Sequence, residues 1–144
     1  MREILFKAKR IDNGEWVEGY VFDDGFVDSK RMFVGGLVIM DYKGTANDRW
    51  EVGTAFYEVD PNTICQYTGL TDKNGNKICE NDVVNYPLEE CCGKITWNDY
   101  EAMFIFDVLL EDGCFEEEYL YDFANYLEVI GNMFDNPELI KKCD

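Results

Sequence analysis

The 144-residue chain has no histidine, which removes the commonest general base and the imidazole metal ligand. Catalysis by a Ser-His or Cys-His pair is therefore excluded. No apolar run approaches the roughly 18–20 residues that cross a bilayer. The N-terminal stretch MREILFKAKR alternates and is charged, unlike a signal peptide. These absences predict a cytoplasmic protein that does not contact the membrane.

Metal and phosphate motifs are absent as well. The six cysteines stand at positions 65, 79, 91, 92, 114 and 143, and no two have the C-x-x-C spacing of a zinc knuckle. With no export signal, we expect all six thiols to be reduced and free of metal. Glu89–Glu90 precede Cys91–Cys92 and disfavour a reactive thiolate there. Gly35–Gly36 lacks the Lys and Ser/Thr of a phosphate loop, so we predict no metal site and no cofactor.

Positive charge is scarce. The formal net charge is −17, with 13 Lys and Arg against 30 Asp and Glu. Residues 1–72 carry 8 basic and 13 acidic side chains (−5), whereas residues 73–144 carry 5 and 17 (−12). Phosphate contacts require Lys and Arg, so we predict no direct binding of nucleic acid. Two interpretations stay open: the acidic half keeps the protein soluble, or it meets a basic partner as a mimic of nucleic acid.

Aromatic residues, in contrast, make up 15% of the chain, and they favour the pleated surface of a strand. Short apolar runs separated by turn-forming residues predict antiparallel strands in a sandwich or small barrel. Asn13–Gly14 and Asn74–Gly75 have the composition of type I′ hairpin turns. The predicted strands cover residues 3–10, 15–22, 32–42, 50–60, 63–69, 82–86, 93–98, 103–110 and 126–132.

Two segments favour helix. Near the end, Asn136 has the composition of an N-cap and Pro137 that of the first helical position, followed by Lys141 and Lys142, which predicts a short terminal helix. Residues 116–127 are ambiguous between one helical turn and two.

Several candidate sites fail on their spacing or surroundings. Asp72, Asn74 and Asn76 are spaced as in a calcium loop, but Lys77 and Val83 stand where that loop needs Gly and Glu, so we interpret the segment as a hairpin. A carboxylate-based glycosidase needs one buried acid with a raised pKa, whereas the adjacent acids here lie in polar loops: Glu89–Glu90, Glu111–Asp112 and Glu116–Glu118. Aromatic residues that could stack bases have acidic neighbours and are better explained by core packing: Trp16, Trp50, Trp97, Phe104 and Phe106.

Three stretches together resemble the YopX family of conserved bacteriophage and prophage proteins. They are MREILFKAKR, QYTGLTDKNGNKICENDVV and LEVIGNMFDNPELI, and the middle one is the most specific. The chain departs from the family pattern at Lys9, Cys79 and Asn81, the last standing where the family usually has Gly. Asn is the best non-Gly residue for positive φ, so Asn81 need not break the turn. The resemblance implies a mostly β protein whose second half is similar to a small SH3-like barrel, a phage or prophage origin, and no established enzyme activity.

We therefore expect a mainly β, β-rich α+β protein of antiparallel strands, with a C-terminal SH3-like barrel and a short terminal helix. Residues 1–60 form an N-terminal β region and residues 61–144 a barrel-like region, packed as one compact unit. No catalytic, cofactor-binding or metal-binding residue is predicted, and the protein is not expected to be an enzyme.

Three functions are weighed. The first is a phage-encoded accessory protein in the cytoplasm of a bacterial host that binds a protein partner or forms a homo-oligomer. The second is an acidic inhibitor that mimics nucleic acid and targets a host DNA-binding protein. The third, disfavoured by the absence of histidine, is a carboxylate-based hydrolase.

Overall fold

The structure is a computed structural model that describes residues 2–26, 28, 30–41 and 50–140, with the backbone alone over 38–41 and 50–53. The fold is mainly β, as predicted, and its strands form antiparallel sheets. No helix among the described residues is long and apolar enough to span a membrane. The chain divides between residues 64 and 65 into two compact units, where we expected the boundary at 60 and 61. Residues 4–64 are called the N-terminal unit; residues 65–144 with 1–3 are called the C-terminal unit.

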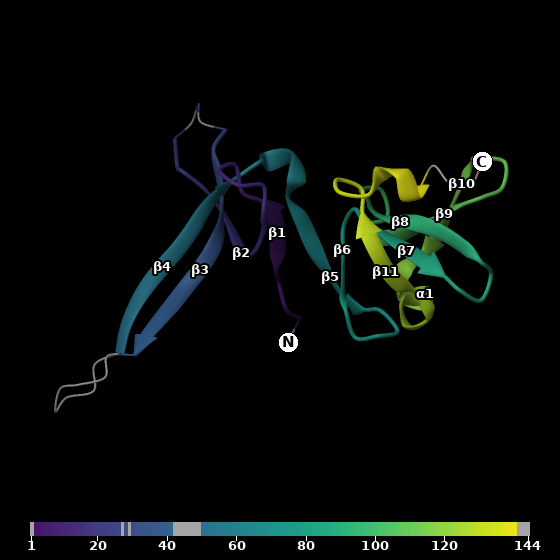
Figure 1. The fold of residues 1–144 in the computed structure, drawn as a ribbon, viewed down its shortest axis with the longest axis horizontal. Coiled ribbons are helices and arrows are strands. Elements are labelled where there is room, and N and C mark those ends of the chain that lie inside the picture. The colour runs from purple at the N-terminus through teal and green to yellow at the C-terminus, as the bar shows by residue number, and fades with distance from the viewer. Residues whose placement is uncertain (1, 27, 29, 42–49, 141–144) are drawn as a thin grey trace. The chain divides into compact units, whose positions relative to one another are not determined.

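The N-terminal unit contains β1 (Phe6–Lys9), β2 (Trp16–Asp23), β3 (Met32–Asp41), β4 (Trp50–Val59) and the 3-10 helix η1 (Pro61–Thr63). Strand β2 changes partner halfway: residues 16–19 pair with β1, and residues 20–23 pair with β3. Strands β3 and β4 pair along their whole length and form the long two-stranded ribbon in Figure 1. The core of this unit is small, with Ala8, Val34 and Val59 fully buried.

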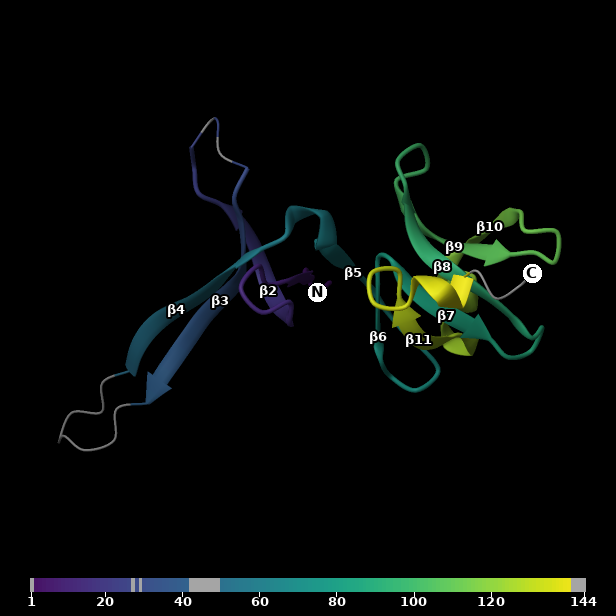
Figure 2. The same ribbon diagram turned by 45° about the horizontal axis from the view of Figure 1, so that its top comes forward.

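Within its described residues, 2–3 and 65–140, the C-terminal unit contains seven strands and most of the helical residues. A hairpin of β5 (Cys65–Thr71) and β6 (Lys77–Cys79) precedes a five-stranded sheet of order β10-β9-β8-β7-β11. Its strands are β7 (Asp82–Tyr86), β8 (Cys91–Asn98), β9 (Met103–Leu109), β10 (Phe115–Tyr119) and β11 (Glu128–Asn132). Strand β10 lies at one margin of this sheet (Figure 2). The core is centred on the fully buried Ile78, Val84, Ile95, Phe106 and Leu127.

Both predicted type I′ turns were wrong. Gly14 and Gly75 have positive φ, at 72° and 82°, but Asn13 and Asn74 do not, whereas a type I′ turn needs positive φ at both central residues. At the second turn the Gly75 amide donates to the Asp72 carbonyl at 3.0 Å, and the Asp72 amide donates to the Asn76 carbonyl at 2.8 Å. This is a type I turn followed by a left-handed glycine, the usual form of a three-residue hairpin loop.

The structure also resolves the helical segments. The ambiguous residues 116–127 form most of β10, the single α-helical turn α1 (Leu120–Phe123) and the 3-10 helix η2 (Ala124–Tyr126). The short terminal helix is η3 (Pro137–Ile140), of the 3-10 type; Lys141 and Lys142 lie outside the described residues. The Asn136 Oδ1 accepts the Asn132 amide of β11 at 3.3 Å, and the Asn136 carbonyl accepts the Leu139 amide at 3.1 Å.

Candidate functional site

One face of the sheet in the N-terminal unit carries a row of large apolar side chains. Directly paired residues of antiparallel strands lie on the same face, and alternate residues along a strand return to it. Tyr20 pairs with Gly35, which pairs with Phe56; Phe22 pairs with Phe33, and Leu37 lies two residues from Gly35. We call the resulting set the aromatic face: Tyr20, Phe22, Phe33, Leu37 and Phe56.

The aromatic face is open to solvent. The exposed fractions are 71% for Leu37, 58% for Tyr20, 47% for Phe22 and 37% for Phe56. The rings of Phe22 and Phe56 meet edge to face with centroids 4.9 Å apart, so the side chains already pack against one another. Phe22, Phe33 and Phe56, with Asp23, line a shallow hollow of about 460 Å³. A soluble protein rarely leaves contiguous apolar surface exposed unless the surface binds something.

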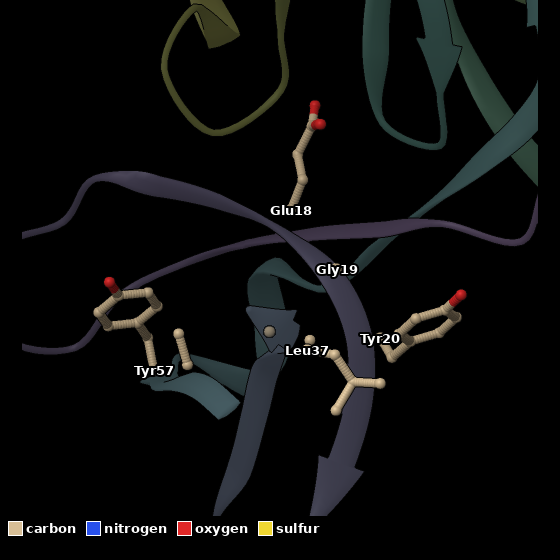
Figure 3. A pocket seen from close by; sticks show the side chains of 8 residues that line it. Glu18, Gly19, Tyr20, Leu37 and Tyr57 are labelled. Atoms are coloured by element: carbon tan, nitrogen blue, oxygen red, sulfur yellow. The ribbon is translucent and has the colours of Figure 1, made fainter. Parts of the chain in front are cut away.

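Glycines line a second hollow, of about 500 Å³, at the point where β2 changes its pairing partner from β1 to β3. A Cβ on Gly19 would lie 2.3 Å from the carbonyl oxygen of Gly35, and a Cβ on Gly35 would lie 1.9 Å from that of Ala55. Only residues without a side chain let the three strands approach this closely. Figure 3 shows Tyr20 and Tyr57 on opposite sides of this hollow, with Leu37 between them and Glu18 directed away.

Paired charges border the aromatic face. The Arg31 guanidinium donates to the Glu58 carboxylate at 3.0 and 3.1 Å and lies over the Phe33 ring, 5.3 Å from its centroid. The hydrogen bond from Arg31 holds the pKa of Glu58 below its ordinary value. On the neighbouring strands, the ammonium groups of Lys7 and Lys9 lie over the Trp16 ring at 5.1 and 5.5 Å. The border therefore has charges of both signs around an apolar centre, as a protein-binding surface has.

The segment with calcium-loop spacing is a hairpin built around a buried carboxylate. Asp72 is only 4% exposed. Its Oδ1 accepts the amides of Asn74 and Asn76 at 2.9 Å each, and its Oδ2 accepts the Val129 amide of β11 at 3.0 Å. Burial pushes the pKa of Asp72 upward, but these hydrogen bonds outweigh it and the pKa lies below its ordinary value. The Asp72 carboxylate is hydrogen-bonded to backbone amides of the protein itself, and it links the hairpin to β11.

The acids weighed as catalytic pairs lie mostly on the surface: Glu89, Glu90, Glu111, Asp112, Glu116 and Glu117 are exposed, and Glu118 is half-buried. Glu80, which was not singled out in the sequence, is a carboxyl whose pKa is raised overall by burial. Partial burial, with a smaller effect from the charge of Asp99, raises the pKa of Glu80. No histidine, lysine or nucleophile in an activated arrangement accompanies it among the interactions described for this residue.

The described cysteines are separate thiols. Cys65, Cys79, Cys91, Cys92 and Cys114 form no disulfide; Cys143 lies outside the described residues. Cys65 accepts the Asn81 side-chain amide at 3.6 Å, and Asn81 has the positive φ expected of it, 65°. Over the part of the chain that the structure describes, no three His, Cys, Asp or Glu side chains are arranged to hold a metal ion.

The five aromatics weighed for base stacking have different environments. Phe106 is fully buried, and Phe104 packs against the same core, as predicted. Trp97 packs edge to face on Phe104 at 4.9 Å but remains 42% exposed, and Trp16 lies under Lys7 and Lys9. The side chain of Trp50 lies outside the described part.

Sequence reasoning missed the aromatic face. Tyr20 and Phe22 stand two residues apart, and Phe56 lies in the alternating run AFYEV, so the pattern was visible. Which of the two apolar faces packs on the core depends on strand pairing, which a single sequence does not give.

A family model described as YopX protein matches residues 9–141 of the chain. The crystal structure of protein EF1440 from Enterococcus faecalis is similar, with 25% sequence identity and a TM-score of 0.56, over 97% of this chain and 99% of that chain. A comparison with curated proteins finds no match.

Proposed function

We propose that this chain, which belongs to the YopX family, acts by binding protein through the aromatic face of its N-terminal unit, and that the partner is a second copy of the chain. The observation that carries the proposal is the exposure of Tyr20, Phe22, Leu37 and Phe56 side by side on one sheet. Aromatic anchors at the centre of an interface supply most of its binding free energy.

The size of the aromatic face fits an interface between two proteins. Its four exposed side chains present on the order of 400 Å² of apolar surface, given that an aromatic residue buries about 150–250 Å². A standard interface takes about 800 Å² from each partner. The border with Arg31 and Glu58 supplies polar surface for the remainder.

Charge favours a second copy as the partner at this face. Residues 4–64 carry 7 basic and 11 acidic side chains, whereas residues 65–144 carry 5 and 18. Two C-terminal units of net charge −13 repel each other, so self-association is least opposed through the N-terminal units, each of net charge −4. A two-fold pair also lets charges of opposite sign at the border, such as Arg31 and Glu58, alternate across the interface.

Two leucines with nearly equal exposure give a matched test. Leu37, on the aromatic face, is 71% exposed, and Leu88, in the turn between β7 and β8, is 70% exposed. We expect the wild-type protein to dimerise reversibly in sedimentation velocity, and Leu37→Lys to weaken the dimer by about tenfold or more, or at least 1.4 kcal/mol. Leu88→Lys, with the same change of charge, leaves the dissociation constant unchanged. A wild-type protein that stays monomeric at high concentration, or equal effects of the two variants, contradicts the proposal.

We propose that the C-terminal unit is a small SH3-like barrel, supported by its short strands, its hairpin β5–β6 and the 3-10 helix η2 before β11. A phage or prophage origin and action in the cytoplasm of the bacterial host are likewise proposed from the family.

The second candidate function, an acidic inhibitor that mimics nucleic acid, rests on the charge of the C-terminal unit. From Glu89 to Glu128 there are twelve carboxylates and one lysine, Lys94, which lies over the Phe115 ring at 4.6 Å. Capture of a purified basic DNA-binding protein from the host, lost as salt rises, would support this function over self-association.

A further inference from the structure

Strand β10 ends the sheet of the C-terminal unit. In the order β10-β9-β8-β7-β11 it pairs with β9 on one side, and within the described residues no strand pairs with its other side. Four of its five residues, Phe115–Glu117 and Tyr119, are exposed. An edge strand offers a row of backbone N–H and C=O groups to an incoming extended segment.

A pocket the size of one side chain adjoins the end of this strand. Leu120 and Tyr121, which follow Tyr119 directly, line it together with Trp97 and Phe104 of β8 and β9, and its volume is about 210 Å³. Most of the lining side chains are apolar or aromatic, Thr68 adds a hydroxyl, and Ala102, which also lines the pocket, has a left-handed φ of 52°. Strained residues of this kind gather at binding sites. Arg2 lines the pocket too, so we place a neutral side chain there, not a cationic one.

The charge of the edge selects the incoming segment. Glu116, Glu117 and Glu118 are consecutive, so their carboxylates alternate between the two faces of β10. Such charges keep neutral and acidic strands from pairing with an edge. They would instead form cross-strand pairs with Lys or Arg on both faces of a basic strand.

We propose that β10 binds an extended, Lys- and Arg-rich segment of a partner protein by strand addition, with one apolar side chain of that segment in the pocket lined by Trp97 and Phe104. Backbone hydrogen bonds along β10 give affinity, the pocket fixes the register, and the glutamates set the sign of the charge. This goes beyond self-association, because it uses a different unit and a different kind of partner.

The probe is a short synthetic peptide with one leucine and with lysines at consecutive positions, so that they lie on both faces of the added strand. It is titrated against the full chain by fluorescence anisotropy. The titration is repeated with the Leu37→Lys variant, in which self-association is weakened. Peptide binding can then be measured without interference from dimer formation. We expect saturable one-to-one binding, weakened by about tenfold when alternate peptide nitrogens are methylated, because methylation removes edge hydrogen bonds. Equal binding of the methylated peptide overturns the proposal, since it would show attraction by charge alone.

Protein variants locate the contact. We expect Glu116→Lys on β10 to weaken binding by about tenfold and Glu89→Lys, an equal change of charge in the β7–β8 turn, to have a much smaller effect. We expect a peptide with alanine in place of the leucine, the alanine peptide, to bind the wild-type chain more weakly than the leucine peptide does. The same difference is expected for Tyr100→Ala, whose ring is fully exposed. For Trp97→Ala, the two peptides should bind equally. Equal effects of the two charge reversals, or leucine selectivity that survives in Trp97→Ala, contradict the proposed site. The alanine peptide needs no altered protein, so misfolding of a variant does not obscure this result.

Discussion

At the scale of single residues, the carboxylate of Asp72 joins elements that are far apart in the sequence. It accepts the amides of Asn74 and Asn76 within its own turn and that of Val129, 57 positions along the chain. The Lys73 amide, next to it, donates to the Leu127 carbonyl at 3.0 Å. A buried carboxylate bound in this way is favoured in its ionised form, and its charge contributes to the stability of the fold.

Asp72→Asn is therefore expected to destabilise the protein in a pH-dependent way. The folded pKa of Asp72 is lowered, so its contribution is complete above the unfolded value of about 3.9 and is lost as the pH falls through the folded value. We expect a loss of about 1–3 kcal/mol in the free energy of unfolding at neutral pH. In urea unfolding curves the difference from the wild type should shrink below about pH 4. Asp122→Asn, at an exposed position, is the control; a difference for Asp72→Asn that does not depend on pH contradicts the role of the charge.

The sequence predicted features that neighbouring residues determine and missed features that depend on distant strands. The positive φ of Asn81 and Gly75 follows from residue type and turn composition, and both were predicted. The burial of Asp72 depends on β11 and was not predicted. The type I′ turns were wrong because Asn-Gly fits both turn types, and Asp72 selects the type I form by binding the amides of the loop.

At the scale of elements, the strands were largely predictable, because alternation and turn residues are local properties. The partner exchange of β2 was not, since it depends on Gly19, Gly35 and Ala55 meeting across three strands. The same non-local pairing places Tyr20 and Phe56 on a single face. The sequence therefore predicted β structure but did not locate the aromatic face.

The close approach of β3 and β4 can be tested with adjacent glycines. A Cβ at Gly35 would lie 1.9 Å from the backbone oxygen of Ala55, whereas one at Gly36 would lie 3.9 Å from the Tyr20 ring, an ordinary contact. We expect Gly35→Ala to lower the free energy of unfolding by about 1–3 kcal/mol through overpacking. Gly36→Ala should change it by less than about 0.5 kcal/mol. Equal stabilities of the two variants in urea unfolding would show that the strands are not so close at Gly35.

At the scale of the whole molecule, the charge is divided unevenly between the units, and this bears on nucleic acid. The N-terminal basic residues have partners within the chain: Lys7 and Lys9 lie over Trp16, and Arg10 donates to Asp12 at 2.8 Å. The acidic C-terminal unit has a field that repels polyanions and attracts basic proteins.

We therefore expect no measurable affinity for duplex or single-stranded oligonucleotides at about 0.15 M salt. Mobility-shift titration gives the answer directly. Micromolar or tighter binding that weakens steeply with salt would contradict the conclusion that the electrostatic field of the protein repels nucleic acid. It would make the strand carrying Lys7 and Lys9 the functional surface.

Hydroxyl-radical footprinting at two protein concentrations tests the central claim, binding through the aromatic face, most directly. It reports the solvent exposure of individual side chains in the unaltered protein. Between concentrations well below and well above the dissociation constant, we expect oxidation of Tyr20, Phe22 and Leu37 to fall several-fold. Oxidation of Leu88 and Tyr100, which are equally or more exposed and belong to the C-terminal unit, should stay constant. Unchanged oxidation of all five side chains, or protection of Leu88 and Tyr100 instead, contradicts the claim.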